Sequence, residues 1–247
     1  MTDNWDFYFL QVEDKPASMY VDLGAIDVAP VAELPVMAYV RLRMNAPRED
    51  GLSSREEFDA LVAIEDHLEK QLAGAGGAYV GRCTTNACRD FFFYLADAAG
   101  WDARVADCMR AFPDYRFEAD TRSEPDWSSY LDYLYPSPAD EQTIGNRRVC
   151  DALSRNGDLL NAAREIDHWA YFPDPRGRDA FLAAAHQLGF ATRVLSNPDD
   201  EDPRYGAQVW RADVPSFAGI DGITLPLFNL AQEHGGEYDG WESVTVT

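Results

Sequence analysis

Aromatic and acidic side chains in the C-terminal half are the residues best suited to chemistry with a partner. Trp169, Tyr171 and Trp241 lie in two segments where apolar and polar residues alternate. Large aromatic side chains ringed by charge are typical of protein-binding hot spots. We therefore expect a partner-binding surface made by Asp167, Trp169, Tyr171, Asp199, Asp200, Asp202, Asp239 and Trp241.

Alternation predicts which way the aromatic side chains face. In a strand at Arg164–Phe172, burial of Ile166 and Ala170 leaves Trp169 and Tyr171 on the open face of the sheet. In a strand at Tyr238–Val246, burial of the valines sends Trp241 to the same open face. An alternative stays open, in which the first half of the chain covers this patch as an internal interface.

The acidic run Asp199-Asp200-Glu201-Asp202 falls in a predicted hairpin loop. It lacks the alternating ligand positions and the distal glutamate of an EF-hand, so a calcium site is not expected. The two remaining interpretations are a solvated loop and a contact surface for a basic partner.

The four histidines show no metal-ligand spacing, and no HExxH motif is present, so no metal site is predicted. His168 alternates with Ile166 and Ala170, which places it on the buried face of its strand. We expect a structural, hydrogen-bonded histidine, with a general base or a ligand as the alternative.

A second open face is predicted in the N-terminal half. In a strand at Pro35–Met44, burial of the aliphatic residues leaves Tyr39, Arg41 and Arg43 exposed. Aromatic and arginine side chains on such a sheet can stack nucleic-acid bases, but the RNA-recognition signature is absent. The alternative is that the N-terminal hairpin or the second domain covers this face.

Motifs for catalysis and cofactor binding are missing. The glycines at 74–77 follow a helix and precede a strand, whereas a dinucleotide-binding loop follows a strand and opens a helix. No nucleophile elbow, catalytic carboxylate pair or kinase motif occurs. We expect no catalytic residue, no cofactor and no enzymatic activity.

Periodicity predicts the same order of elements twice. The first half reads as a hairpin with a turn at Pro16 followed by βαββαβ, and the spacing in its second helix places Trp101 on the buried face. The second half reads as a helix that begins at Ser137-Pro138, a favoured capping pair, followed by βαββαβ. The final helix is expected at Thr224–His234, with Pro226 in its first turn. The predicted fold is α+β: two ferredoxin-like βαββαβ sandwiches in tandem, in domains 1–135 and 136–247.

Charge is the unusual feature of the composition. The 247 residues include 43 acidic and 21 basic side chains, which gives a net charge of −22. This charge opposes direct nucleic-acid binding and favours a basic protein segment as partner, although it also fits a surface adapted for solubility. With four cysteines and neither a signal peptide nor a membrane segment in the sequence, we expect a cytoplasmic location.

Several combinations in the second half carry a family resemblance: Leu153–Asp158, Arg164–Phe172, Phe181–Phe190, Leu230-Ala231 and Glu237–Glu242. Together they resemble the RraB family of protein regulators of ribonuclease E activity. The first half resembles an uncharacterised bacterial domain that occurs fused to RraB-like modules.

The resemblance implies a non-enzymatic, acidic protein that binds an RNA-degrading enzyme and changes its activity and its assembly partners. Our leading hypothesis is therefore a protein–protein regulator. The alternatives are a small-molecule or RNA-binding module that uses the open sheet faces, and an enzyme of unknown reaction.

Overall fold

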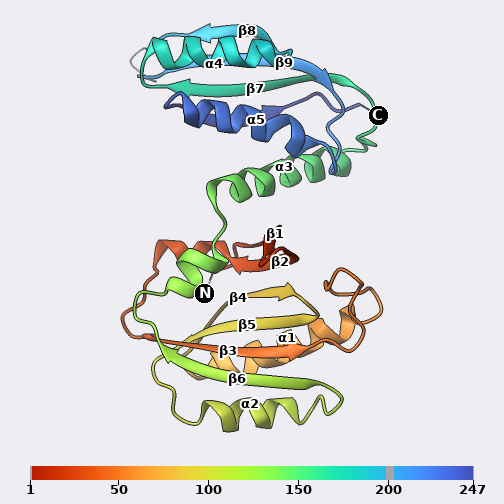
Figure 1. Cartoon of the computed structure of the whole chain (residues 1–247), viewed down its shortest axis with the longest axis vertical. Helices are drawn as coiled ribbons and strands as arrows, with labels where there is room; N and C mark the ends of the chain where they lie inside the picture. The colour runs from red at the N-terminus through yellow and green to blue at the C-terminus, as the bar shows by residue number, and fades with distance from the viewer. Residues whose placement is uncertain (1, 199–202, 247) are drawn as a thin grey trace. The chain divides into compact units, whose positions relative to one another are not determined.

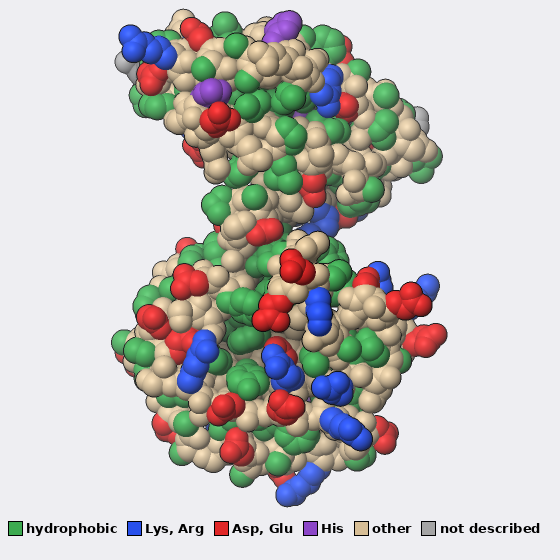
Figure 2. Space-filling view, in the orientation of Figure 1, with side chains coloured by type: hydrophobic (Ala, Val, Ile, Leu, Met, Phe, Trp, Pro, Cys, Tyr) green, Lys and Arg blue, Asp and Glu red, His purple; other side chains and the backbone are tan. Residues whose placement is uncertain are grey.

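The structure is a computed structural model that describes residues 2–198 and 203–246. The chain divides into two compact units, Met1–Pro136 and Ser137–Thr247, each with its own sheet and hydrophobic core (Figure 1). Acidic and basic side chains are interspersed on the visible face of each unit (Figure 2).

The first unit holds a six-stranded antiparallel sheet in the order β1-β2-β4-β5-β3-β6. The four strands β4-β5-β3-β6 have the ferredoxin-like order, with the first and third strands of the motif in the centre, and the β1–β2 hairpin extends the sheet beside β4. Its elements are β1 (Trp5–Val12), β2 (Lys15–Asp22), β3 (Val36–Arg43), α1 (Phe58–Leu72), β4 (Ala78–Thr85), β5 (Cys88–Leu95), α2 (Trp101–Met109) and β6 (Arg116–Ser123), with short helical turns at Leu23–Asp27, Ala73–Ala75 and Ser129–Leu134.

The predicted turn of the N-terminal hairpin is wrong in position. The turn is made by Glu13 and Asp14, both with positive φ, while Pro16 lies inside β2 opposite Gln11. Two left-handed residues form a turn whose twist matches that of the flanking strands, so this pair closes the hairpin two residues earlier than Pro16 would.

Helices α1 and α2 cover one face of the first sheet and enclose its core. Leu61, Ile64 and Leu68 of α1 are fully buried, and Trp101 of α2 packs its ring on Phe93 of β5. Trp101 is therefore a core residue, as its helical spacing predicts.

The opposite face of this sheet is partly covered by residues 124–136, here called the cover segment. The Trp127 ring stacks on Tyr94 with ring centroids 3.9 Å apart, and the Tyr133 hydroxyl donates to the Cys83 sulfur at 3.3 Å. The expectation that the hairpin covers the face is wrong, because the hairpin extends the sheet beside β4 and the observed cover comes from the chain that follows β6. Cover by the second domain stays a prediction. Tyr39, Arg41 and Arg43 stay outside it as half-buried or exposed residues.

The second unit holds a four-stranded antiparallel sheet in the order β10-β7-β9-β8, again the ferredoxin-like order. The predicted tandem of ferredoxin-like sandwiches is confirmed. The elements are α3 (Pro138–Arg155), β7 (Arg164–Phe172), α4 (Pro175–Gln187), β8 (Ala191–Ser196), β9 (Tyr205–Asp213), α5 (Ile220–Glu233) and β10 (Glu237–Glu242).

Helices α4 and α5 pack on the buried face of this sheet, and α3 packs against α5 and β10. Ser137 begins α3 with a capping box, in which its hydroxyl accepts from the Asp140 amide. The prediction for α5 is wrong at its start, because the helix begins at Ile220 and Pro226 lies inside it. Burial of Ile220, Ile223 and Leu227 on one face extends the helix ahead of Pro226 despite the lost backbone hydrogen bond.

Candidate functional site

A pocket of about 290 Å³ lies on the open face of the second sheet, between the neighbouring strands β7 and β10. We call it the β7–β10 pocket. It is lined by Trp169, Tyr171, Asp239, Gly240, Trp241 and Glu242.

Strand β7 alternates strictly, which explains why its two aromatic residues reach this pocket. Ile166, His168 and Ala170 are buried beneath the helices, while Trp169 and Tyr171 are half-buried on the other face. The predicted orientation of Trp169 and Tyr171 is therefore confirmed, and so is that of Asp167 on the same face.

Trp241 does not lie on the open face, so its predicted orientation is wrong. The pairing between β7 and β10 shifts between Tyr238 and Gly240, which is a β-bulge. The extra residue breaks the two-residue period and turns both Tyr238 and Trp241 toward the helices, where each is only 7% exposed. Trp241 therefore reaches the pocket only as part of its buried wall.

Trp241 is held in the core by a polar network. Its indole nitrogen donates to Asn146 Oδ1 at 2.9 Å, and Asn146 Nδ2 donates to Thr224 Oγ1 at 2.6 Å and to Asp221 Oδ1 at 2.7 Å. A buried indole N–H needs such an acceptor, so the network connects α3, α5 and β10 through one asparagine.

The two carboxylates at the pocket, Asp239 and Glu242, are exposed and have no ion pair or hydrogen bond with any described residue. Asp167 is different, because Arg193 Nε lies 2.8 Å from its carboxylate and also pairs through Nη2 with Glu165. The pocket therefore presents two free negative charges beside two half-buried rings, while Asp167 is already neutralised.

Two arginines of the chain itself stack on aromatic rings of this open face. The guanidinium carbon of Arg204 lies 4.2 Å from the centre of the Tyr171 ring, and that of Arg193 lies 5.0 Å from the Trp210 ring. These contacts demonstrate that rings on this face accept guanidinium groups.

Trp210 is a further aromatic residue of this face, and it is absent from the predicted partner-binding surface. It faces Asp167 across the β7–β9 pair and occupies the open face beside Trp169. The signal was present in the sequence, since burial of Ala207 and Val209 on β9 places Trp210 on the opposite side by the same alternation.

His168 is enclosed beneath the sheet and lies outside the pocket. It is fully buried, and its Nδ1 is 2.7 Å from the Tyr238 hydroxyl, which confirms the prediction of a structural histidine. Burial, with a smaller contribution from the Arg211 charge, lowers the pKa of His168 to about 3, so the ring is neutral at physiological pH.

Asp199, Asp200 and Asp202 lie outside the described residues, and their part in partner binding stays a prediction. Within the described part of the chain, no cluster of histidine, cysteine, aspartate and glutamate side chains is arranged to hold a metal ion. All four cysteines carry free thiols. Among residues 2–198 and 203–246, every helix is too short or too polar to cross a bilayer.

Fold and site together define a tandem ferredoxin-like α+β protein with an aromatic and acidic pocket on its second sheet. The chain belongs to the family of unknown function DUF695, whose model matches residues 3–135, just over half of its length. Residues 143–243 match the family model of Regulator of ribonuclease activity B, RraB. The resemblance that the sequence carries in each half is therefore confirmed.

The similarity of this chain to individual proteins is weak. No curated protein matches the chain. Among solved structures, an unknown protein from Galdieria sulphuraria is 13% identical with a TM-score of 0.24. A candidate glycine cleavage system transcriptional repressor is 10% identical with a TM-score of 0.23. In both cases the similarity covers 85% of this chain and 98% of the other.

Proposed function

We propose that this protein is a non-enzymatic regulator that binds a ribonuclease-related protein, and that ribonuclease E is that partner. The observation that carries the proposal is the match of residues 143–243 to the RraB family. A regulator of this kind acts by occupying a surface of its partner, so the residues of interest are those that recognise the partner.

The β7–β10 pocket is suited to an arginine side chain of the partner. Trp169 supplies an aromatic ring for a guanidinium group, beside the Tyr171 ring that Arg204 already contacts. Asp239 and Glu242 supply carboxylates without ionic partners among the described residues. Arg204 on Tyr171 and Arg193 on Trp210 illustrate the same chemistry within the chain.

The net charge of −22 supports a basic partner segment. A strongly negative protein attracts such a segment over distances of about 10 Å at moderate ionic strength, which speeds association. Because most of this attraction acts before contact, we expect binding to weaken steeply as salt is added.

The proposal is tested by measuring association of the full chain with ribonuclease E from the same organism by surface plasmon resonance. The double variant Asp239→Asn with Glu242→Gln should weaken binding at least fivefold at low salt, and Trp169→Ala should accelerate dissociation. At about 0.5 M salt the effect of the double variant should largely vanish.

Glu233→Gln is the matched control, because Glu233 is an exposed carboxylate on α5, away from the pocket. It should leave binding nearly unchanged. The control removes one negative charge and the double variant removes two, so a loss of binding free energy in the control about half as large as in the double variant would assign the effect to net charge alone and remove the pocket from the interaction. Absence of binding by the unmodified chain would refute ribonuclease E as the partner.

A further inference from the structure

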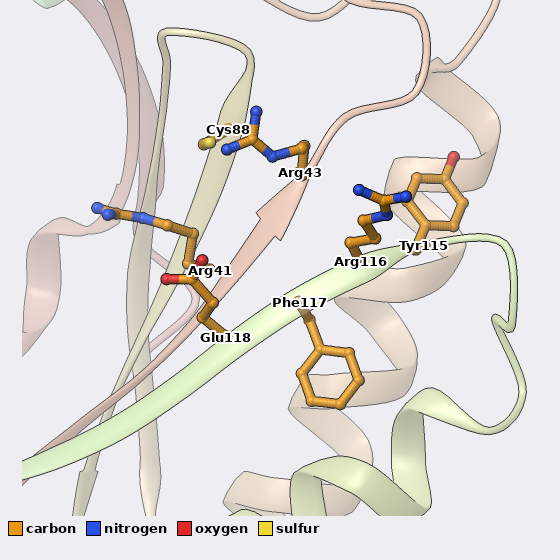
Figure 3. Close-up of a pocket in the computed structure, with 7 residues that line it drawn as sticks. All are labelled: Arg41, Arg43, Cys88, Tyr115, Arg116, Phe117 and Glu118. Carbon is orange, nitrogen blue, oxygen red and sulfur yellow. The ribbon is translucent and has the colours of Figure 1, made fainter.

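The first unit contains a larger hollow, of about 640 Å³, on the part of its sheet that the cover segment leaves open. It lies over the end of β3, the start of β5 and the start of β6 (Figure 3). Its lining residues are Arg41, Arg43, Cys88, Tyr115, Arg116, Phe117 and Glu118.

Two of the three arginines at this hollow are cross-strand neighbours without a counterion. Arg43 of β3 and Arg116 of β6 are direct cross-strand partners, so their side chains leave the same face of the sheet side by side. Both are exposed, and neither forms an ion pair or hydrogen bond with any described residue. Like charges at directly opposed positions destabilise a sheet, so this pair has an energetic cost in the unliganded protein.

Arg41, the neighbouring arginine, has the carboxylate partner that Arg43 and Arg116 do not have among the described residues. Arg41 Nε and Nη2 contact the two carboxylate oxygens of Asp90 at 2.8 Å and 2.6 Å, a two-pronged pairing that raises the pKa of Arg41. In a chain with 43 acidic side chains against 21 basic ones, Arg43 and Arg116 nonetheless have no such carboxylate. Their free guanidinium groups suit an external oxyanion, which would relieve their repulsion.

The surroundings limit how large that anion can be. Glu118 and Asp120 follow Arg116 on the same face of β6, and both are exposed. A polyanion running along this strand would meet their negative charges, whereas a compact group held at Arg43 and Arg116 would not. The charge pattern therefore favours a single oxyanion group over a nucleic-acid backbone.

We propose that the hollow bordered by Arg43 and Arg116 is a binding site for the phosphate or carboxylate group of a small molecule. This site belongs to the first unit, whereas the β7–β10 pocket belongs to the second. The proposal therefore gives the DUF695 unit a ligand-binding role of its own. Cys88 lies directly opposite Arg43 on β5, with its sulfur beside the Arg43 guanidinium group (Figure 3), so a bound anion should restrict access to its thiol.

The test uses the full chain, with inorganic phosphate and succinate titrated separately at constant ionic strength maintained with chloride. Two quantities are measured: the Tm and the rate at which iodoacetamide alkylates Cys88, the one cysteine of the four that is not buried. Saturable stabilisation and slower alkylation are expected with at least one of the anions. Whichever anion has the higher affinity identifies the group as phosphate or carboxylate.

Arg43→Gln and Arg116→Gln should each weaken the apparent affinity at least tenfold. Both variants should keep the Tm of the unliganded protein or raise it slightly, because each removes a like-charge contact. Arg55→Gln is the control, since Arg55 is exposed and has no ionic partner among the described residues. It should bind the anion as the unmodified chain does.

Three outcomes would overturn the proposal. The first is the absence of a saturable effect of either anion, and the second is an equal effect in all three variants, which would be a general response to salt. The third is binding of a single-stranded RNA oligonucleotide that depends on Arg43, with no response to phosphate or succinate. That result would make this face a nucleic-acid interface instead.

Discussion

His168 makes one polar contact in an otherwise apolar setting. Its Nδ1 meets the Tyr238 hydroxyl, the Phe190 ring packs edge-on against it, and its Nε2 is buried without a hydrogen-bond partner. The protein therefore holds this ring neutral, and protonation would place an uncompensated charge in the core.

This environment predicts a specific pH dependence of stability. The pKa of His168 is about 3 in the folded chain, against roughly 6.5 in an unfolded one. Between these values the unfolded state binds a proton that the folded state does not, so stability falls as pH falls through this window, by up to about 1.4 kcal/mol per pH unit. Above pH ~6.5 the contribution of His168 is constant.

His168→Gln should abolish this contribution. The free energy of unfolding of the His168→Gln variant, measured with urea, should approach that of the unmodified chain as the pH is lowered from about 7 to 4. The carboxylates titrate in both proteins and cancel in the difference. His186→Gln, at an exposed site on α4, serves as the control and should keep a constant difference. A constant difference for His168→Gln as well would contradict the predicted neutral ring.

At the scale of elements, the bulge in β10 determines which of its side chains are buried under the helices and which are exposed at the β7–β10 pocket. It brings Tyr238 to His168 and Trp241 to Asn146 on the same buried face. Asp239 is left exposed at the pocket. Gly240 permits this arrangement because its φ of +118° lies in a region that other residues rarely adopt.

Gly240→Ala should therefore destabilise the second unit by about 1–3 kcal/mol. The space around Gly240 is open, so the cost is backbone strain rather than a clash. Gly222→Ala provides a contrast, because Gly222 is an exposed helical glycine that also has open space around it. That variant should gain about 0.5–1 kcal/mol in stability. Similar effects of the two variants in chemical unfolding would refute the role given to the bulge.

At the scale of the molecule, each unit has a separate core. The core of the first unit includes Trp101, and that of the second includes Phe181. Each core is assembled from the residues of its own unit. We therefore predict that a substitution in one core destabilises that unit and leaves the stability of the other unit unchanged.

Trp101→Ala and Phe181→Ala should each cost about 3–5 kcal/mol, because each removes a large buried side chain. Hydrogen exchange measured by mass spectrometry should show lost protection only in residues 2–136 for the first variant and only in the second unit for the other. Loss of protection throughout the chain in either variant would show that the units unfold together.

The sequence by itself determined the order of elements, the division into two sandwiches and the orientation of β7. These features depend on local patterns: helical spacing around Trp101, alternation around Trp169, and the capping residue Ser137. Each pattern involves residues close together in the chain, so hydrophobic periodicity is sufficient to identify it.

Only the tertiary structure decided the rest of both sites. A single extra residue in β10 reversed the orientation of Trp241, because a bulge depends on how one strand pairs with another. The cover segment and the cross-strand pair Arg43 and Arg116 likewise arise from contacts between distant parts of the chain. Local periodicity predicts which face of a sheet a side chain occupies, but it does not identify the strand or the residue that lies opposite, and that pairing determines which charges remain unpaired on an open sheet.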